Sequence, residues 1–475
     1  MEKTYAQYVQ DIRKVTGCLQ QELGEPKGKK IVILSRTNYE YGAVVFGTMM
    51  AGAVIVTLNQ GKTWAELEYE LGMVEPDLIF NDGIDYGYRA QLEALYGARL
   101  RPMDAWTAAP EAEMVNRIDH EGLLMLMFTS GTTGRSKGVM LSEKNYFTAC
   151  QMYINGQKDI LDQEKRLAPQ YLDRNFSHFT LVPMFHLSGF ICYFAYGMHG
   201  WTLNLCCDAR DLRRDMSLMH SDAMSTPPVL VEMIYNEIKR GHADRLNGLW
   251  NLSCSSAILD PAILSDLVKN GFYINQCYSM TELAGYGLLN VAQEGDHLRA
   301  LGKPDGFCEV KVDETGEICV RGGCVMLGYY KDSETTAETI DKDGWLHTGD
   351  LARVDEEGYY YMTGRKKNLI ILDSGENINP KSWKHRGQVR SREGMCCKRN
   401  GQEDRRGGLL RRGQTAAGAG LYHRGKPHPA AVQAYERSGV QYRAAAAQRC
   451  RQAAAPVIQM RSNARMHKWA GRPAD

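Results

Sequence analysis

Short apolar runs and longer amphipathic segments alternate along the first third of the chain. The short runs have the continuous apolar pattern of buried strands, whereas the longer segments repeat apolar residues at helical spacing. Strands that alternate with helices predict a parallel sheet joined by crossover helices. We therefore expect strands at residues 31–34, 54–58, 77–80 and 123–127, and helices at residues 1–23, 39–51, 63–74 and 142–153.

The second half of the chain continues this pattern and then changes to hairpins beyond residue 300. The predicted fold class is therefore α/β. It consists of a large N-terminal region of mixed and parallel sheets flanked by helices, and of a small subdomain rich in β-hairpins. The expected elements are strands at 180–183 and 273–276, a strand and turn over 249–259, and a Pro-Pro turn followed by a helix over 224–239. Hairpins are expected over 309–321 and between 344–350 and 358–365.

The composition is that of a soluble globular protein too long for one core. The chain has 475 residues, of which 44% are hydrophobic and 24% charged, so two or three domains are expected. No apolar run reaches the ~18 residues that a membrane span needs. The 13 cysteines form no disulfide framework and no metal-ligand spacing, and no signal peptide is recognisable. This pattern predicts a reduced, cytoplasmic location and no integral membrane segment.

The charge is unevenly distributed behind a formal net charge of +1. Residues 386–475 hold 19 Lys and Arg against 5 Asp and Glu, which leaves 38 basic and 51 acidic residues before them. A basic segment of this kind can bind nucleic acid or a membrane. Because it lacks aromatic platforms and a recognisable folded module, we expect no nucleic-acid partner.

A glycine-rich and hydroxyl-rich loop follows the predicted strand at 123–127. Its glycines let backbone N–H groups converge on one point, and its lysine adds a positive charge, which together suit a phosphate. A solvent-exposed turn is the alternative, but the preceding strand and the lysine favour phosphate. It is not a Walker A loop, because Ser136 stands where that pattern requires glycine. The candidate residues are Thr129, Ser130, Gly131, Thr132, Thr133, Gly134 and Lys137.

Three further polar residues occupy positions suited to a site. His186 lies where a strand is expected to end beside a glycine-bearing turn, although a lone histidine is usually structural. Glu282 follows the hydroxyl residue Thr281, shortly after the strand predicted at 273–276 ends at the edge of the sheet. It either binds Mg²⁺ or is a first-turn acid of a helix. Asp350 could accept hydrogen bonds from both hydroxyls of a ribose, or it could be an ordinary turn residue.

In their order and spacing, these stretches resemble the acyl-adenylate-forming (AMP-binding) superfamily, from about residue 4 to about residue 382. The match includes residues 129–138, 278–282, 316–330, 344–350 and 358–378. The resemblance implies an acid–thiol ligase of the acyl-CoA synthetase type. It would use ATP and Mg²⁺ to form an acyl-AMP and would then transfer the acyl group to coenzyme A. Residues 183–186 resemble the fatty-acyl and aryl branch, which implies a role in fatty acid metabolism.

The resemblance also implies a role for each candidate residue. The loop from Thr129 to Lys137 would hold the β- and γ-phosphates, Thr281 would contact the α-phosphate, and Glu282 would carry Mg²⁺. His186 would lie between the acyl pocket and the phosphates. The remaining roles are adenine binding by Tyr278, Ser256 and Ala257, ribose binding by Asp350 and Arg365, and a hinge at Lys367.

Beyond residue 380 the resemblance fades. If residues 381–384 are encoded AAG-AGC-TGG-AAR, reading from the third base gives Glu-Leu-Glu, which is the continuation typical of the family. We therefore expect a frameshift and a C-terminal small domain that is largely absent or disordered, and we also expect a truncated N-terminus. The predicted parts are an α/β core at 1–300, a β-rich subdomain at 301–363, a hinge and first hairpin at 364–382, and an aberrant basic tail, expected to be disordered, at 383–475.

This C-terminus affects the expected activity. Members of the family deliver a near-terminal lysine to the adenylation site, and residues 383–475 contain no Pro-x-x-x-x-Gly-Lys pattern to supply it. The expected activity is therefore acyl-CoA synthesis at an impaired rate. The alternatives are transfer of the acyl group to the pantetheine of a carrier protein, and a non-catalytic remnant that only binds ATP.

Overall fold

The computed structural model describes most of the first 366 residues and two short strands beyond them. The chain forms two compact units, one containing Met1–Thr363 and the other Gly364–Ala455. The second unit contributes the two-stranded sheet of β18 (Ile370–Ile371) and β19 (Asn377–Ile378). The described residues are 2–113, 117–129, 135–163, 176–198, 200–255, 259–366, 370–371 and 377–378.

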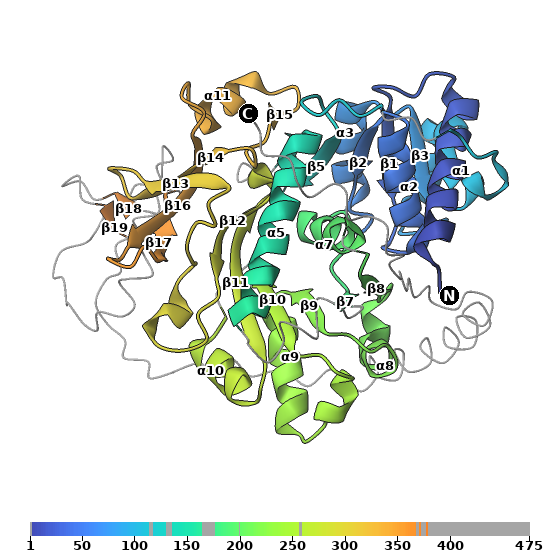
Figure 1. Ribbon diagram of the computed structural model, residues 1–475. Helices are drawn as coiled ribbons and strands as arrows, with labels where there is room; N and C mark the ends of the chain where they lie inside the picture. Colours follow the sequence, from blue (N-terminus) through green and yellow to red (C-terminus); the bar gives the residue numbers. More distant parts are fainter. Residues whose placement is uncertain are drawn as a thin grey trace, which may run out of the picture. The chain divides into compact units, whose positions relative to one another are not determined.

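A seven-stranded sheet organises the N-terminal part of the first unit (Figure 1). Its strands β5, β2, β1, β3 and β4 run parallel to one another, whereas β6 and β15 are antiparallel additions at one edge. In spatial order the strands are β15 (Gly328–Tyr329), β6 (Lys137–Leu141), β5 (Met125–Thr129), β2 (Val54–Thr57), β1 (Lys30–Leu34), β3 (Leu78–Asn81) and β4 (Leu100–Pro102).

The helices of this layer lie where the apolar spacing predicts them, and one further helix was not expected. The first helix begins at a capping box, in which the Thr4 hydroxyl accepts a hydrogen bond from the Gln7 N–H at 3.2 Å. The segment 82–120 lacks a clear period, yet it contains a short helix and the edge strand β4. The helices are α1 (Tyr5–Leu23), α2 (Tyr39–Met50), α3 (Trp64–Val74) and α4 (Arg89–Tyr96).

A second, six-stranded sheet follows, in the spatial order β12-β11-β10-β9-β7-β8. All neighbours pair in parallel except β11 and β12, which are antiparallel. The long helix α5 runs alongside β12 and packs against α7 (Figure 1). The strands are β7 (Ser177–Thr180), β8 (Thr202–Leu205), β9 (Ala223–Thr226), β10 (Asn251–Ser255), β11 (Tyr273–Met280) and β12 (Gly285–Asn290), and the helices are α5 (Glu143–Gln163), α7 (Leu187–Met198), α8 (Leu212–Leu218), α9 (Pro228–Lys239) and α10 (Pro261–Lys269).

A four-stranded antiparallel sheet contains the two predicted hairpins, in the spatial order β13-β14-β16-β17. Gly316 lies in the first turn with a φ of 84°, which glycine adopts without strain. These elements are β13 (Cys308–Val312), β14 (Glu317–Gly322), α11 (Ser333–Thr339), β16 (Leu346–Val354) and β17 (Tyr360–Arg365). Single 3₁₀ turns occur at η1 (Gly97–Arg99), η2 (Ala105–Ala108), η3 (Ala209–Asp211), η4 (Ala243–Leu246), η5 (Thr281–Leu283) and η6 (Asp296–Arg299).

The arrangement confirms the predicted α/β class with parallel and mixed sheets and a hairpin-rich part. Strands β1 and β2 are buried along nearly their whole length, because helices cover both faces of a parallel sheet. The apolar stretch 185–207 forms α7 and β8 of this core. Among the described residues, no helix combines the length and the apolar composition needed to cross a membrane.

His178 on β7 is a fully buried histidine that ties stability to pH. Its Nε2 accepts a hydrogen bond from the Ser225 N–H at 3.0 Å, and its Nδ1 has no partner among the described residues. Burial lowers the pKa of His178 to about 3, whereas a histidine in the unfolded chain has a pKa of about 6.5. The unfolded chain therefore binds a proton at this position that the folded chain excludes.

We expect His178 to make the protein less stable as the pH falls from about 6.5 towards 3, by about 1.4 kcal/mol per pH unit at most. Urea unfolding of wild type and His178→Gln at pH 7 and pH 5 measures this effect. The variant should lose less stability between the two pH values than wild type does. His242→Gln is the control and should behave like wild type. Equal pH slopes for wild type and His178→Gln would contradict the assignment.

Candidate active site

The glycine-rich loop joins two strands of the first sheet. Thr129 ends β5 and Lys137 begins β6, and the two residues are direct partners in the antiparallel ladder. The loop therefore connects two antiparallel strands. Its residues Ser130, Gly131, Thr132, Thr133 and Gly134 lie outside the described residues.

The Lys137 ammonium lies above an aromatic ring from a distant part of the sequence. Its Nζ is 4.8 Å from the centroid of the Tyr329 ring. The contact arises because β15 pairs with β6, with Tyr329 opposite Val139. An ammonium over a ring face is attracted by the ring quadrupole, which restricts the lysine without neutralising its charge.

The same tyrosine holds the candidate metal-binding carboxylate. The Tyr329 hydroxyl donates a hydrogen bond to Glu282 Oε1 at 2.9 Å, and the Met326 N–H donates to the Glu282 carbonyl at 2.9 Å. Burial, followed by the nearby Glu282 charge, raises the pKa of Tyr329 above its ordinary value, so the phenol remains a donor. Tyr329 thus contacts both the candidate phosphate-binding cation and the candidate Mg²⁺ ligand.

Thr281 and Glu282 form the turn η5, directly after β11. The turn ends at Ala284, whose φ of 51° is left-handed, and the chain then returns antiparallel as β12. Glu282 is therefore neither inside nor at the start of an α-helix. Glu282 instead lies in the first turn of a three-residue 3₁₀ helix, so both interpretations that the sequence left open, an Mg²⁺ ligand and a first-turn acid, stay predictions.

A second contact joins the six-stranded sheet to the hairpin sheet. The Tyr278 hydroxyl donates a hydrogen bond to Asp350 Oδ2 at 2.8 Å. Tyr278 lies at an irregularity in the β11–β12 register, and Asp350, which is 7% exposed, lies inside β16. Asp350 is therefore a strand residue and not the turn residue that was the alternative.

His186 does not lie at a strand end as expected, because β7 ends at Thr180; it directly precedes α7 and is held there in one orientation. The ring nitrogen Nδ1 of His186 accepts a hydrogen bond from the Ser188 N–H at 3.3 Å. The backbone N–H of His186 donates to the Pro183 carbonyl at 2.9 Å. Surrounding protein desolvates the imidazole and lowers the pKa of His186, so the ring is neutral at pH 7. Its accepting Nδ1 implies that Nε2 carries the proton.

Four predicted site residues remain, namely Arg365, Ser256, Ala257 and Lys367. Arg365 is the last residue of β17 and belongs to the second unit. Ser256, Ala257 and Lys367 lie outside the described residues, although Ser255 ends β10 directly beside Cys277 of β11.

The chemical groups of the described candidate residues suit an Mg²⁺-nucleotide. Mg²⁺ prefers oxygen ligands and is usually bound by one or two carboxylates together with substrate phosphates, which fits Glu282 beside the Thr281 hydroxyl. Lys137 supplies charge for phosphate, and the Tyr278–Asp350 pair offers a ring and a carboxylate for a nucleoside. The sequence pattern had not singled out Tyr329 as a site residue. Only the pairing of β15 with β6 places its ring between Lys137 and Glu282.

Comparison with known families identifies the class of protein. A family model described as AMP-binding enzyme matches residues 1–330, and the chain belongs to this family. Among curated proteins it is similar to a 4-coumarate–CoA ligase-like protein 2 of Arabidopsis thaliana. The two are 29% identical over 409 residues, which cover 76% of this chain and 68% of the relative. A feruloyl-CoA synthase of an Amycolatopsis species is 29% identical over 394 residues, covering 79% of this chain and 76% of the relative.

Solved structures share the fold. The o-succinylbenzoate CoA synthetase of Bacillus subtilis, in complex with its acyl-adenylate intermediate, matches with a TM-score of 0.68 and 23% identity. The match covers 80% of this chain and 76% of the synthetase. The N-terminal domain of FACL13 from Mycobacterium tuberculosis matches with a TM-score of 0.64 and 19% identity, over 76% of this chain and 92% of that domain.

Proposed function

We propose that this protein is an ATP-dependent acid–thiol ligase. It activates a carboxylic acid as acyl-AMP, releases pyrophosphate, and transfers the acyl group to coenzyme A. The observation that carries the proposal is the position of Tyr329, which contacts both Lys137 and Glu282. These contacts support the proposal, because phosphoryl chemistry on an Mg²⁺-nucleotide requires a cation for phosphate and a carboxylate for the metal at one place.

Lys137 and the hairpin loop act on the leaving pyrophosphate. Negative charge grows on the β- and γ-phosphates as the bond to the α-phosphorus breaks, and a fixed cation stabilises that charge. The contact with the Tyr329 ring keeps the ammonium near its position before the nucleotide binds. When bound at Glu282 and Thr281, Mg²⁺ would neutralise further phosphate charge.

Tyr278 and Asp350 act on the nucleoside. The Tyr278 hydroxyl orients the Asp350 carboxylate through the 2.8 Å hydrogen bond, so that the carboxylate can accept hydrogen bonds from ribose hydroxyls. The Tyr278 ring offers a face for the adenine. Neutral His186 would lie at the acid and would donate from Nε2 without adding a charge that competes with Lys137.

We propose an aryl or fatty acid as the substrate, with aryl acids tested first. The names of several relatives support this order: 4-coumarate–CoA ligase-like, feruloyl-CoA synthase and 2-succinylbenzoate–CoA ligase. A relative from Arabidopsis thaliana is named a peroxisomal OPC-8:0-CoA ligase, which is the reason to test fatty acids as well. We also propose a cytoplasmic location, supported by free thiols at the described cysteines.

Release of pyrophosphate from ATP, measured with a panel of aryl and fatty acids, tests the proposal. We expect release that depends on the acid and on Mg²⁺, and a coenzyme A thioester detectable by mass spectrometry. Acyl-AMP without a coenzyme A thioester would favour a carrier protein as the acceptor. ATP binding without pyrophosphate release under any condition would contradict the proposal and favour a non-catalytic remnant.

We further propose that turnover is slow, because residues 383–475 offer no lysine in the pattern that the family uses. The same assay measures this rate. Turnover as fast as that of the feruloyl-CoA synthase relative, assayed in parallel, would contradict the impairment but would support the ligase assignment.

A further inference from the structure

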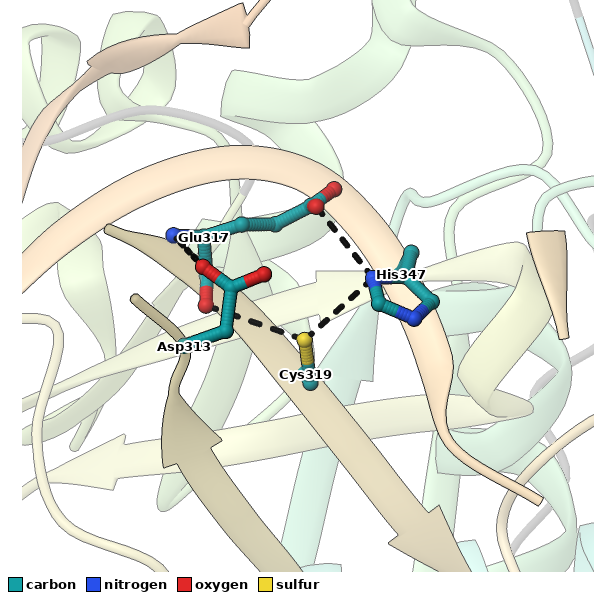
Figure 2. Close-up of side chains that lie close together, drawn as sticks. All are labelled: Asp313, Glu317, Cys319 and His347. Carbon is teal, nitrogen blue, oxygen red and sulfur yellow. Dashed lines mark hydrogen bonds and ion pairs between the residues drawn. The ribbon is translucent and has the colours of Figure 1, made fainter. Parts of the chain in front are cut away.

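Four potential metal ligands lie together on the hairpin sheet, apart from the residues proposed to bind ATP. They are Asp313, Glu317, Cys319 and His347, and one ligand atom from each lies within 4.8 Å of all the others. Figure 2 shows the four side chains pointing toward one another from β14, β16 and the turn after β13. We propose that they form a binding site for one Zn²⁺ ion.

The sheet register brings the two nitrogen and sulfur ligands together. Cys319 on β14 and His347 on β16 are direct cross-strand partners. The β14–β16 register shifts between Glu317 and Cys319, yet the side chains of both residues reach His347 Nδ1. Three of the four ligands are thus fixed by paired strands, which hold side chains more firmly than loops do.

The distances between ligand atoms match those around zinc. His347 Nδ1 is 3.5 Å from Cys319 Sγ and 3.3 Å from Glu317 Oε2. A tetrahedral zinc with ordinary bond lengths separates nitrogen from sulfur by about 3.5 Å and nitrogen from oxygen by about 3.4 Å. Zinc could therefore replace the present contacts of Nδ1 with little movement of these three side chains.

The groups around the ligands also resemble a metal site. His347 Nε2 lies 3.5 Å from Asp341 Oδ2, and Asp341 Oδ1 is held by the Asp343 and Trp345 N–H groups at 2.9 Å each. A metal-bound histidine commonly directs its other ring nitrogen to such a carboxylate. Glu317 Oε1 accepts a hydrogen bond from the Gly349 N–H at 2.7 Å, which orients the carboxylate toward Nδ1.

Burial and ligand chemistry favour zinc over the other common cations. Cys319 is fully buried and the Glu317 side chain is 3% exposed, while the His347 side chain, at 32%, leaves a path from solvent. A thiolate and an imidazole suit Zn²⁺, whereas Mg²⁺ and Ca²⁺ prefer oxygen. Binding would release the thiol proton of Cys319, and the thiolate with the two carboxylates would more than neutralise the two positive charges of the metal.

Zinc content and zinc affinity of the full chain test this proposal. After loading with Zn²⁺ and dialysis, wild type should retain one zinc more per chain than Cys319→Ala. Cys18→Ala, which removes a buried thiol from α1, should retain as much as wild type. Asp341→Asn should weaken zinc binding by about 10- to 100-fold, because it removes the carboxylate charge beside His347 Nε2 and leaves the four proposed ligands in place. Equal zinc content in wild type and folded Cys319→Ala would overturn the proposal.

X-ray absorption of wild type with one equivalent of Zn²⁺ gives a result even if Cys319→Ala does not fold. We expect one sulfur at about 2.3 Å and nitrogen or oxygen ligands at about 2.0–2.2 Å. A spectrum with only nitrogen and oxygen ligands, or with several sulfurs, would assign the metal elsewhere. The Glu317–His347 contact would then be an ordinary hydrogen bond. Neither readout depends on ligase activity.

Discussion

Replacing Glu282 by glutamine is expected to lower acid-dependent pyrophosphate release by about 100- to 1,000-fold, as the loss of a charge-stabilising group in an active site commonly does. The amide keeps the size of the side chain and can still accept the hydrogen bond from Tyr329. It lacks the negative charge that an Mg²⁺ ligand needs. The effect should therefore come from the metal and not from a disturbed turn.

The dependence of the rate on Mg²⁺ concentration separates these causes. Glu282→Gln should require more Mg²⁺ for half-maximal activity, and its Mg²⁺-free ATP affinity should equal that of wild type. Glu294→Gln is the control. It changes an exposed carboxylate in the loop after β12 and should leave both quantities unchanged. If Glu282→Gln has the wild-type Mg²⁺ dependence, Glu282 is not the metal ligand.

Removing the Tyr329 hydroxyl refines this test. Tyr329→Phe keeps the ring under Lys137 and removes only the hydrogen bond to Glu282. We expect a smaller loss than in Glu282→Gln, about 10-fold, which corresponds to one hydrogen bond to a charged group. A larger loss than in Glu282→Gln would mean that the hydroxyl has a role beyond orienting the carboxylate.

Replacing Asp350 by asparagine is expected to weaken ATP binding by about 10- to 100-fold, since a hydrogen bond to a charged group contributes about 1.5–3 kcal/mol. The amide oxygen can still accept from the Tyr278 hydroxyl. One of the two acceptors for the ribose hydroxyls becomes a donor. Isothermal titration calorimetry with ATP measures the change and remains informative if turnover is slow.

Two further variants locate the cause of that change. Tyr278→Phe should weaken ATP binding less than Asp350→Asn does, because the ring remains available to the adenine. Asp343→Asn, in the exposed turn before β16, should bind ATP as wild type does. Unchanged ATP affinity in Asp350→Asn would remove this residue from the nucleotide site.

The order of helices and strands could be predicted from local patterns, because apolar periodicity reflects which face of each element is buried. The runs at 31–34 and 54–58 are examples, since both are strands of the buried parallel sheet. Element ends were less accurate. The strand expected at 273–276 continues through Met280 as β11, because residues beyond Gln276 pair with β12, with Tyr278 opposite Leu288.

The sequence by itself determined the α/β class, the residue types of the candidate phosphate and nucleotide motifs, and their order along the chain. Only the tertiary structure decided which residues meet. Tyr278 and Asp350 are 72 positions apart, and Tyr329 reaches Glu282 across 47 positions. The cluster of Cys319 and His347 likewise depends on the register of β14 and β16. Such contacts depend on sheet order and strand register, which a local hydrophobic pattern does not encode.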